Sequence, residues 1–140
     1  MTIPDDAAAF LALHKRGFLV TRRRDGSPTI HPMVAFFADG RVTMTTYRKS
    51  AKARNVERDP RAGVLMVNGY AKDDVRGVLV RGRGVLRQAI MEAPPTSGRD
   101  VPKVSDTVTA RVADRMASGK RIFLDVEPDA VAFAQRLWSE

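Results

Sequence analysis

Two Asp-Gly dipeptides early in the chain constrain its fold more than any other feature of the sequence. Asp25-Gly26 separates the β-prone run 18–21 from the run 29–37, and Asp39-Gly40 separates 29–37 from a third run, 41–46. Asp-Gly between β-prone runs is a strong hairpin signal, because both residues tolerate the positive φ angles that tight turns require. The first half of the chain is therefore predicted to be a three-stranded antiparallel meander.

Two short helices are predicted beside these strands. Residues 4–13 begin with a proline and two acids and continue as an alanine-rich apolar stretch, with Gly17 as the stop. Acids in a first turn suit the positive end of the helix dipole, and glycine commonly ends a helix. Residues 50–58 contain good helix formers after Ser50, a preferred N-cap, and Asp59-Pro60 ends this second helix.

The second half of the chain adds further strand signals. Runs 64–67 and 75–86 are predicted strands, and Gly82 and Gly84 mark a bend or the close approach of another backbone or a ligand. Six or seven strands with two or three small helices predict a closed or nearly closed antiparallel barrel with helices at its ends. The remaining predicted elements are a loop over 93–105, a helix over 107–116, a strand over 121–126, a turn at 127–129 and a last strand over 130–138.

Length and composition exclude several classes of protein. The 140 residues are enough for one core and too few for two domains, so a single domain over 1–140 is expected. Cysteine is absent, which excludes disulfides, thiolate nucleophiles and cysteine metal sites and makes a cytoplasmic location the default. No signal peptide is expected, since two acids precede the first apolar stretch, and no apolar run is long enough to span a membrane.

The formal net charge of +8 points to an anionic partner, and nucleic acid is the first candidate. The excess is concentrated in two blocks: 41–61 has seven basic and two acidic residues, and 75–87 has four arginines and no acid. A platform for single-stranded nucleic acid would interleave such charges with exposed aromatic residues, and only 6% of this chain is aromatic. A small anion is therefore favoured over nucleic acid.

The first basic block, 41–61, contains the segment richest in groups that can bind an anion. Thr45, Thr46 and Ser50 provide hydroxyl groups, the helix start provides free N–H groups, and Lys52 and Asn55 follow. A phosphate monoester requires directed donors with positive charge, and we expect Ser50, Lys52 and Asn55 to be its direct contacts. The alternative is that Ser50 is only an N-cap and Lys52 lies on a solvated helix face, which is the commoner role of a charge run.

Other polar residues carry weaker signals. Arg81 and Arg83 point to one face of their strand and form either a second anion clamp or the solvated face of a half-buried strand. His31 lies beside Pro32 and has no second ligand at metal spacing, so a structural role and no metal site are expected. No hydrolase, P-loop or dinucleotide motif occurs, so no catalytic residue can be named. If the chain is an enzyme, a bound cofactor is expected to supply the difficult chemistry.

Taken together, these residues resemble a known family, the pyridoxamine 5'-phosphate oxidase-like split barrels, and most closely its flavin and deazaflavin oxidoreductase branch. The similarity covers residues 5–87 well. It implies a mostly β (α+β) fold, a six-stranded antiparallel split β-barrel of the FMN-binding type with a few short helices. The matching strings are Asp25-Gly26-Ser27-Pro28, Pro32-Met33-Val34 and Thr45-Thr46-x-x-x-Ser50-x-Lys52-Ala53-x-Asn55-Val56-x-Arg58-Asp59-Pro60-Arg61-x-x-Val64.

The resemblance also implies a partner, a cofactor and a site. Such proteins are homodimers that bind FMN or the deazaflavin coenzyme F420 in two grooves between subunits. Residues matching 50–55 hold the cofactor phosphate, and Trp138 would face the ring across the interface. The residues that would lie along the ring and the ribityl chain are Pro32, Met33, Val34, Thr45 and Thr46.

Two departures argue against a true pyridoxamine 5'-phosphate oxidase. Ala51 stands where that enzyme has an arginine, and Phe36 stands where it has a basic residue. The F420-using branch commonly shows K-x-R-N, which matches Lys52-Ala53-Arg54-Asn55, so F420 is favoured over FMN. Arg81 and Arg83 would suit the acidic tail of F420.

The sequence therefore predicts a cytoplasmic, homodimeric oxidoreductase that uses F420 or FMN to transfer hydride to or from a small unsaturated molecule. The loop 92–105 and the partner subunit are expected to build the substrate side. The alternative is a non-catalytic protein that binds or stores FMN, F420 or a tetrapyrrole such as a haem breakdown product.

Overall fold

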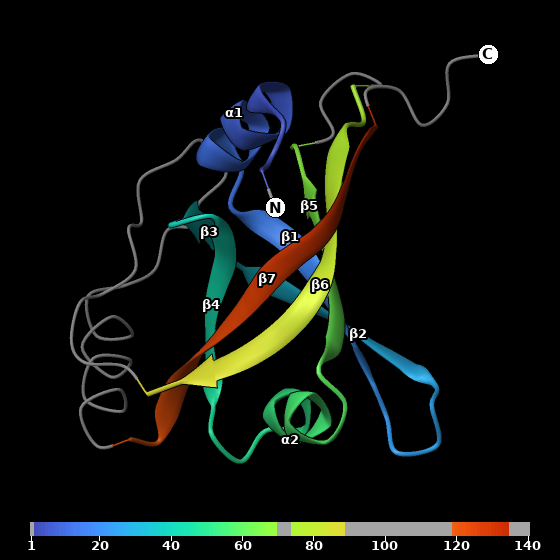
Figure 1. The fold of residues 1–140 in the computed structure, drawn as a ribbon, viewed down its shortest axis with the longest axis vertical. Coiled ribbons are helices and arrows are strands. Elements are labelled where there is room, and N and C mark those ends of the chain that lie inside the picture. The colour runs from blue at the N-terminus through green and yellow to red at the C-terminus, as the bar shows by residue number, and fades with distance from the viewer. Residues whose placement is uncertain (1, 70–73, 89–118, 135–140) are drawn as a thin grey trace.

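The computed structural model describes residues 2–69, 74–88 and 119–134. Within these residues the chain forms two helices and seven strands (Figure 1). In chain order they are α1 (Asp5–Leu13), β1 (Arg16–Arg22), β2 (Pro28–Val34), β3 (Phe36–Ala38), β4 (Arg41–Tyr47), α2 (Ala51–Arg58), β5 (Arg61–Val67), β6 (Gly77–Arg87) and β7 (Arg121–Ala134).

All the described strands belong to one antiparallel sheet, in the order β2-β1-β5-β6-β7-β4-β3. β2 and β3 are therefore its two edges, although only Ala35 separates them in the sequence. The chain can step from one edge to the other in one residue only if the sheet curls until its edges approach each other, as Figure 1 shows. The predicted split antiparallel barrel is confirmed.

The sheet has seven strands rather than six because the run 29–37 is not one strand. Ala35 is fully buried, and its N–H donates to the carbonyl oxygen of Lys15 at 2.7 Å. Residues before this point pair with β1, whereas residues after it pair with β4. Both Asp-Gly turns are confirmed, with positive φ at Gly26, Asp39 and Gly40. They close two separate hairpins, so the predicted three-stranded meander is wrong.

The barrel interior is the hydrophobic core, and the two helices lie at opposite ends of it (Figure 1). α1 buries Phe10 and Leu11, and α2 buries Ala53 and Val56. Because side chains alternate along a strand, each strand gives one face to this core and the other to its surroundings. The inward apolar strand residues include Leu19, Val42, Met44, Val64, Met66, Val78, Val80, Leu124 and Val126.

The ends of the two helices differ in how well the sequence predicts them. α1 ends at Leu13, and Gly17, its predicted stop, lies in β1. A Cβ on Gly17 would lie 2.6 Å from the carbonyl oxygen of Leu65 in β5, so the glycine permits a close approach of two strands. The second helix is confirmed: it spans 51–58 between an N-cap at Ser50 and a C-cap at Asp59.

β7 contains a bulge where a turn at 127–129 is predicted. Arg81 pairs with Ala130 and Gly82 pairs with Pro128, so one extra residue lies in β7 between them. A Cβ on Gly82 would lie 1.8 Å from the carbonyl oxygen of Glu127, which confirms the predicted close approach of another backbone. The two strands predicted for this region are therefore one strand as far as Ala134.

Some predictions fall outside the described residues: the loop 93–105, the helix 107–116 and the role of Trp138. Among the helices that the structure describes, none is long and apolar enough to cross a membrane.

Candidate functional site

β2 is an edge strand, so part of its backbone has no strand partner on one side. Its side chains alternate: His31 and Met33 are partly buried, whereas Pro32 and Val34 are exposed on the outer face. A ligand lying along this free edge can therefore contact backbone groups and side chains from both faces of the strand.

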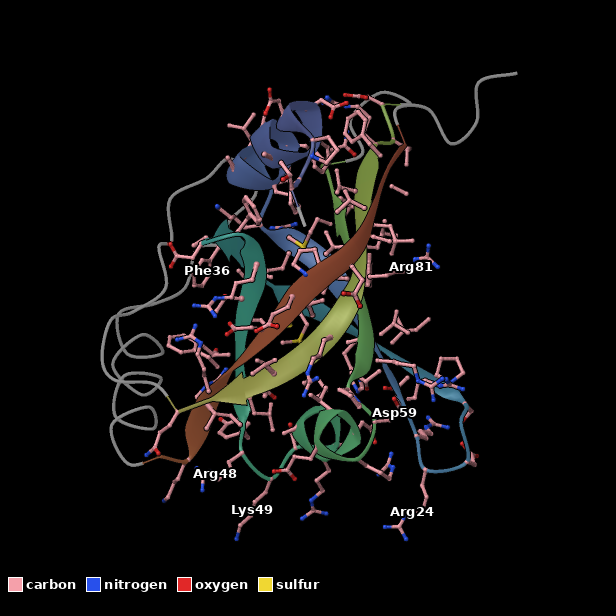
Figure 2. All side chains as sticks on the ribbon, viewed as in Figure 1. Arg24, Phe36, Arg48, Lys49, Asp59 and Arg81 are labelled. Atoms are coloured by element: carbon pink, nitrogen blue, oxygen red, sulfur yellow. The ribbon has the colours of Figure 1, made fainter. Side chains whose placement is uncertain are left out.

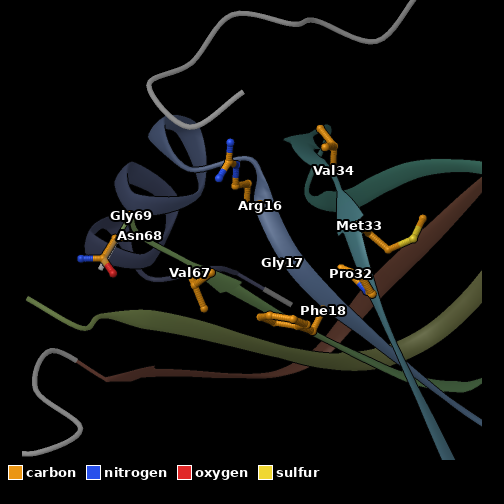
Figure 3. A pocket seen from close by; sticks show the side chains of 9 residues that line it. All are labelled: Arg16, Gly17, Phe18, Pro32, Met33, Val34, Val67, Asn68 and Gly69. Atoms are coloured by element: carbon orange, nitrogen blue, oxygen red, sulfur yellow. The ribbon is translucent and has the colours of Figure 1, made fainter. Parts of the chain in front are cut away.

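A pocket of about 390 Å³ lies at the end of β2 that is nearer to α1 (Figure 3). The predicted ring-binding residues Pro32, Met33 and Val34 all line it. This volume falls within the range of roughly 300–1,000 Å³ that is usual for small-molecule sites. The other lining residues are Arg16, Gly17, Phe18, Val67, Asn68 and Gly69.

Sequence reasoning missed the contributions of Arg16 and Phe18 to this pocket. In the β1–β2 ladder Phe18 pairs with Pro32, and Arg16 pairs with Val34. Extending the register of the predicted hairpin would have placed these pairs side by side. The contribution of Val67 depends on the pairing of β1 with β5, which no local signal indicates.

Hydroxyl groups gather where β4 leads into α2. The hydroxyl oxygens of Thr46 and Ser50 are 2.9 Å apart, and the Ser50 hydroxyl also accepts the N–H of Ala53 at 3.2 Å. The N-cap alternative for Ser50 is therefore confirmed, although the cap lies among other polar groups. Lys52 follows in the first turn, half-buried and without a hydrogen bond or ion pair to any described residue. This arrangement leaves a lysine beside the helix N–H groups that favour anions.

His31 connects this cluster to β2. Its Nδ1 atom is buried and has no hydrogen-bond partner. Burial lowers the pKa of His31, and the nearby charges of Lys52 and Arg23 lower it further. Three nitrogen-bearing side chains from β2, α2 and the β1–β2 turn thus lie close enough to interact electrostatically. An anion among them would provide the missing acceptor, so His31, for which the sequence predicts a structural role, is also a site candidate.

Two predicted site residues already have partners within the protein. Asn55 is buried; its amide donates to the Thr21 hydroxyl at 3.1 Å and accepts from Arg58 at 2.9 Å. Thr45 is on the opposite face of β4 from Thr46, and its hydroxyl accepts from Arg121 at 3.0 Å. Their contacts to a cofactor stay predictions. The same holds for Thr46, Ser50 and Lys52, which lie together at the start of α2, and for Pro32, Met33 and Val34, which line the β2 pocket.

The remaining sequence candidates lie elsewhere. Arg81 and Arg83 are exposed on the outer face of β6, as the solvated-face alternative predicts. No group of three or more metal-ligating side chains occurs in the part of the chain that the structure describes.

His31 gives the protein an expected pH dependence of stability. Its pKa in the folded chain is lowered from the ordinary value of 6.5, so the unfolded chain binds this proton more readily. Stability from this group is therefore full above about pH 6.5 and falls as the pH drops below it. We expect His31→Gln to flatten the decrease in the urea midpoint between about pH 7 and pH 5. An unchanged slope would contradict the assignment.

Comparison with known proteins identifies the family. The family model described as pyridoxamine 5'-phosphate oxidase matches residues 3–134. The chain belongs to this family. Its match spans both helices and all the described strands, so the residues that line the β2 pocket and the α2 start are all family positions.

Several solved structures share the fold of this chain. A conserved hypothetical protein, Rv2991 from Mycobacterium tuberculosis, superposes with a TM-score of 0.70 at 24% identity, covering 96% of this chain and 86% of the other. A protein named F420 reductase gives a TM-score of 0.65 at 20% identity, with coverages of 93% and 98%. A FAD-binding protein from Mesorhizobium loti gives a TM-score of 0.65 at 15% identity and covers 94% of both chains. Comparison with curated protein sequences gives no match.

Proposed function

We propose that this chain is a flavin- or deazaflavin-dependent oxidoreductase that binds F420, or else FMN, along the free edge of β2. The observation that carries the proposal is the presence of two complementary features that β2 connects. An apolar pocket lies at Pro32–Val34, and Lys52 with the hydroxyl groups of Thr46 and Ser50 lies at the start of α2, where the charge of Lys52 reaches the buried His31 of β2. A flavin or deazaflavin has the matching halves, a flat ring and a phosphate on a polyol chain.

The donor set fits such a cofactor. Lys52 would pair with the phosphate, and the buried nitrogen of His31 would donate a hydrogen bond to it. The Thr46 hydroxyl would donate to Ser50, and the Ser50 hydroxyl would then donate its own proton to the phosphate. None of the described residues that line the β2 pocket is an Asp or Glu, so none of them opposes an anionic ligand with a negative charge. The bound cofactor would supply hydride transfer, while the chain orients it and excludes water from the ring. Relatives named for F420 reduction and FAD binding support this class of function.

The second part of the proposal is a homodimer that completes the pocket. Ile30 and Val34 on the outer face of β2 are 64% and 48% exposed, and Phe18 and Val20 of β1 continue the same apolar face. Exposed apolar patches of this kind mark interaction surfaces. Because Phe18 and Val34 also line the pocket, a second copy on this face would cover the ring site.

The dimer can be tested by one substitution and its control. Ile30→Asp would place a charge on the proposed interface, and we expect a shift from the mass of two chains to that of one in sedimentation equilibrium. Leu13→Asp makes the same chemical change at a residue of α1 with 55% exposure and should leave the dimer intact. A wild-type chain that sediments as a monomer would contradict this part of the proposal.

Activity is tested with the cofactor-loaded protein and a panel of enones and quinones. With prereduced F420 or FMN in excess over the protein, we expect the visible absorbance of the oxidised cofactor to return over multiple turnovers for at least one member of the panel. Tight binding without turnover would instead support the non-catalytic storage protein.

A further inference from the structure

A second concave site, separate from the β2 pocket, lies between the β1–β2 turn and the far end of α2. It has a volume of about 510 Å³. Figure 2 shows two of its residues, Arg24 in the turn and Asp59 after α2, in the same part of the molecule. The charged residues that line it include Arg22, Arg23, Arg24, Arg58, Asp59 and Arg61.

We propose that this arginine pocket binds a small polyanion, one with two or more phosphate or carboxylate groups, at a site distinct from the phosphate site at the start of α2. Five arginines and two aspartates line it, which leaves an excess of three positive charges. The guanidinium fork is the side chain that best matches the two oxygens of a carboxylate or phosphate.

Both acids of the pocket are already engaged. Asp59 accepts two hydrogen bonds from Arg61, at 2.9 and 2.7 Å, and lies 3.9 Å from Arg22. These hydrogen bonds lower the pKa of Asp59 to about 2, so it is ionised at neutral pH and offsets one arginine. Asp25 accepts the Ser27 hydroxyl at 2.6 Å within its own turn. Hydrogen bonds from Ser27 and the charge of Arg23 lower the pKa of Asp25, so both acids offset part of the positive charge and the excess of three remains.

The other three arginines of the pocket differ in how firmly hydrogen bonds hold their side chains. Arg58 donates to the carbonyl oxygen of Arg22 and to the Asn55 side chain, each at 2.9 Å, which holds its guanidinium in place. Arg23 and Arg24 make no side-chain hydrogen bond or ion pair with described residues. An anion entering the pocket would meet one oriented guanidinium and two that can close on it.

The helix dipole explains only part of this cluster. Arg58 lies in the last turn of α2, where positive charge is favourable in any protein, and Arg61 begins β5 three residues later. Arg23 and Arg24 come from a different element, and nothing in the turn requires a run of arginines. The β1–β2 hairpin, α2 and the start of β5 thus bring five arginines and only two acids to one concavity, and this excess of positive charge is better explained by an anionic ligand than by solvation.

The pocket also has an electrostatic connection to the candidate cofactor site. Arg23 lowers the pKa of His31, as does Lys52 at the other end of α2. An α-helix of this length extends over about 12 Å. The anionic groups that occupy the arginine pocket can therefore belong to either of two ligands. One is a ligand whose phosphate lies at Lys52 and whose acidic tail reaches the pocket, and the other is a free polyanion that binds only there.

The test titrates two probes, inorganic pyrophosphate and a triglutamate peptide, by calorimetry at fixed ionic strength. Every titration uses the full chain with Lys52→Ala, so that the phosphate site at the start of α2 does not contribute and no flavin is needed. The result is thus independent of whether the proposed oxidoreductase function is correct. The pocket variant is Arg23→Gln with Arg24→Gln. The matched control is Arg81→Gln with Arg83→Gln, which removes the same charge from exposed positions on β6; Figure 2 shows Arg81 well away from Arg24.

We expect at least one probe to bind with a stoichiometry of one, at least about tenfold more weakly in the pocket variant and unchanged in the control. Preference for triglutamate would indicate the acidic tail as the source, and preference for pyrophosphate a free phosphorylated ligand. Equal weakening in both variants would show general charge attraction and overturn the proposal. Absence of binding for both probes would overturn it as well. Unfolding midpoints of both variants check that each is folded.

Discussion

Asp125→Ala should destabilise the protein by about 3 kcal/mol. Asp125 has no exposed surface; it accepts the Thr43 hydroxyl at 2.7 Å and two N–H groups of Arg87, at 2.5 and 3.2 Å. Arg41 lies 3.7 Å away, so one carboxylate faces two guanidinium groups. Its removal leaves these cations facing each other and Thr43 without an acceptor, and this cost is large because the site is shielded from water.

Urea unfolding of the wild type and the variant would measure this loss. The control is Asp129→Ala, which removes the same charge from an exposed position of the same strand and should change the free energy of unfolding by less than about 0.5 kcal/mol. Equal effects of the two substitutions would contradict a special role for Asp125. The partial exposure of Arg87 and Arg41, 38% and 32%, places the expected loss at the lower end for a broken buried ion pair.

Lys52→Ala should weaken binding of F420 or FMN by roughly 10- to 150-fold, the equivalent of about 1.5–3 kcal/mol for a hydrogen bond to a charged group. Lys52 has no partner among the described residues, and the charge from Lys52 reaches the buried His31. Its substitution should therefore cost ligand affinity and little stability.

The matched control for this substitution is Lys49→Ala. Lys49 is exposed in the loop before α2, and Figure 2 shows its side chain pointing away from the barrel. The Lys49→Ala substitution removes the same charge three positions away from Lys52, and we expect it to change cofactor affinity by less than about twofold. If both variants lose affinity equally, the lysine acts through the overall field of the protein rather than by pairing with the phosphate.

The parts of the structure that depend on neighbouring residues could be predicted. Asp25-Gly26 and Asp39-Gly40 form turns because their backbones tolerate positive φ, and α2 begins at Ser50 because a serine side chain can satisfy a helix N–H. The family resemblance rests on these same local segments, which is why residues 32–34 could be placed at a pocket.

The parts of the structure that depend on pairing between residues far apart in the sequence could not be predicted. The break at Ala35 depends on a hydrogen bond to Lys15 and on the curl of the whole sheet. Asp125 and Thr43 are 82 residues apart, so no local pattern connects them. His31 becomes a candidate only in the folded chain, because its buried nitrogen and the charge of Lys52 come together through tertiary structure.

The central claim is that β2 and the start of α2 bind a flavin or deazaflavin, and one titration tests it most directly. Purified wild-type protein is titrated with F420 and, separately, with FMN, with binding followed by fluorescence and visible absorbance. The proposed site predicts saturable binding of one cofactor per chain, tighter for F420 than for FMN. Absence of saturable binding for both cofactors would contradict the account.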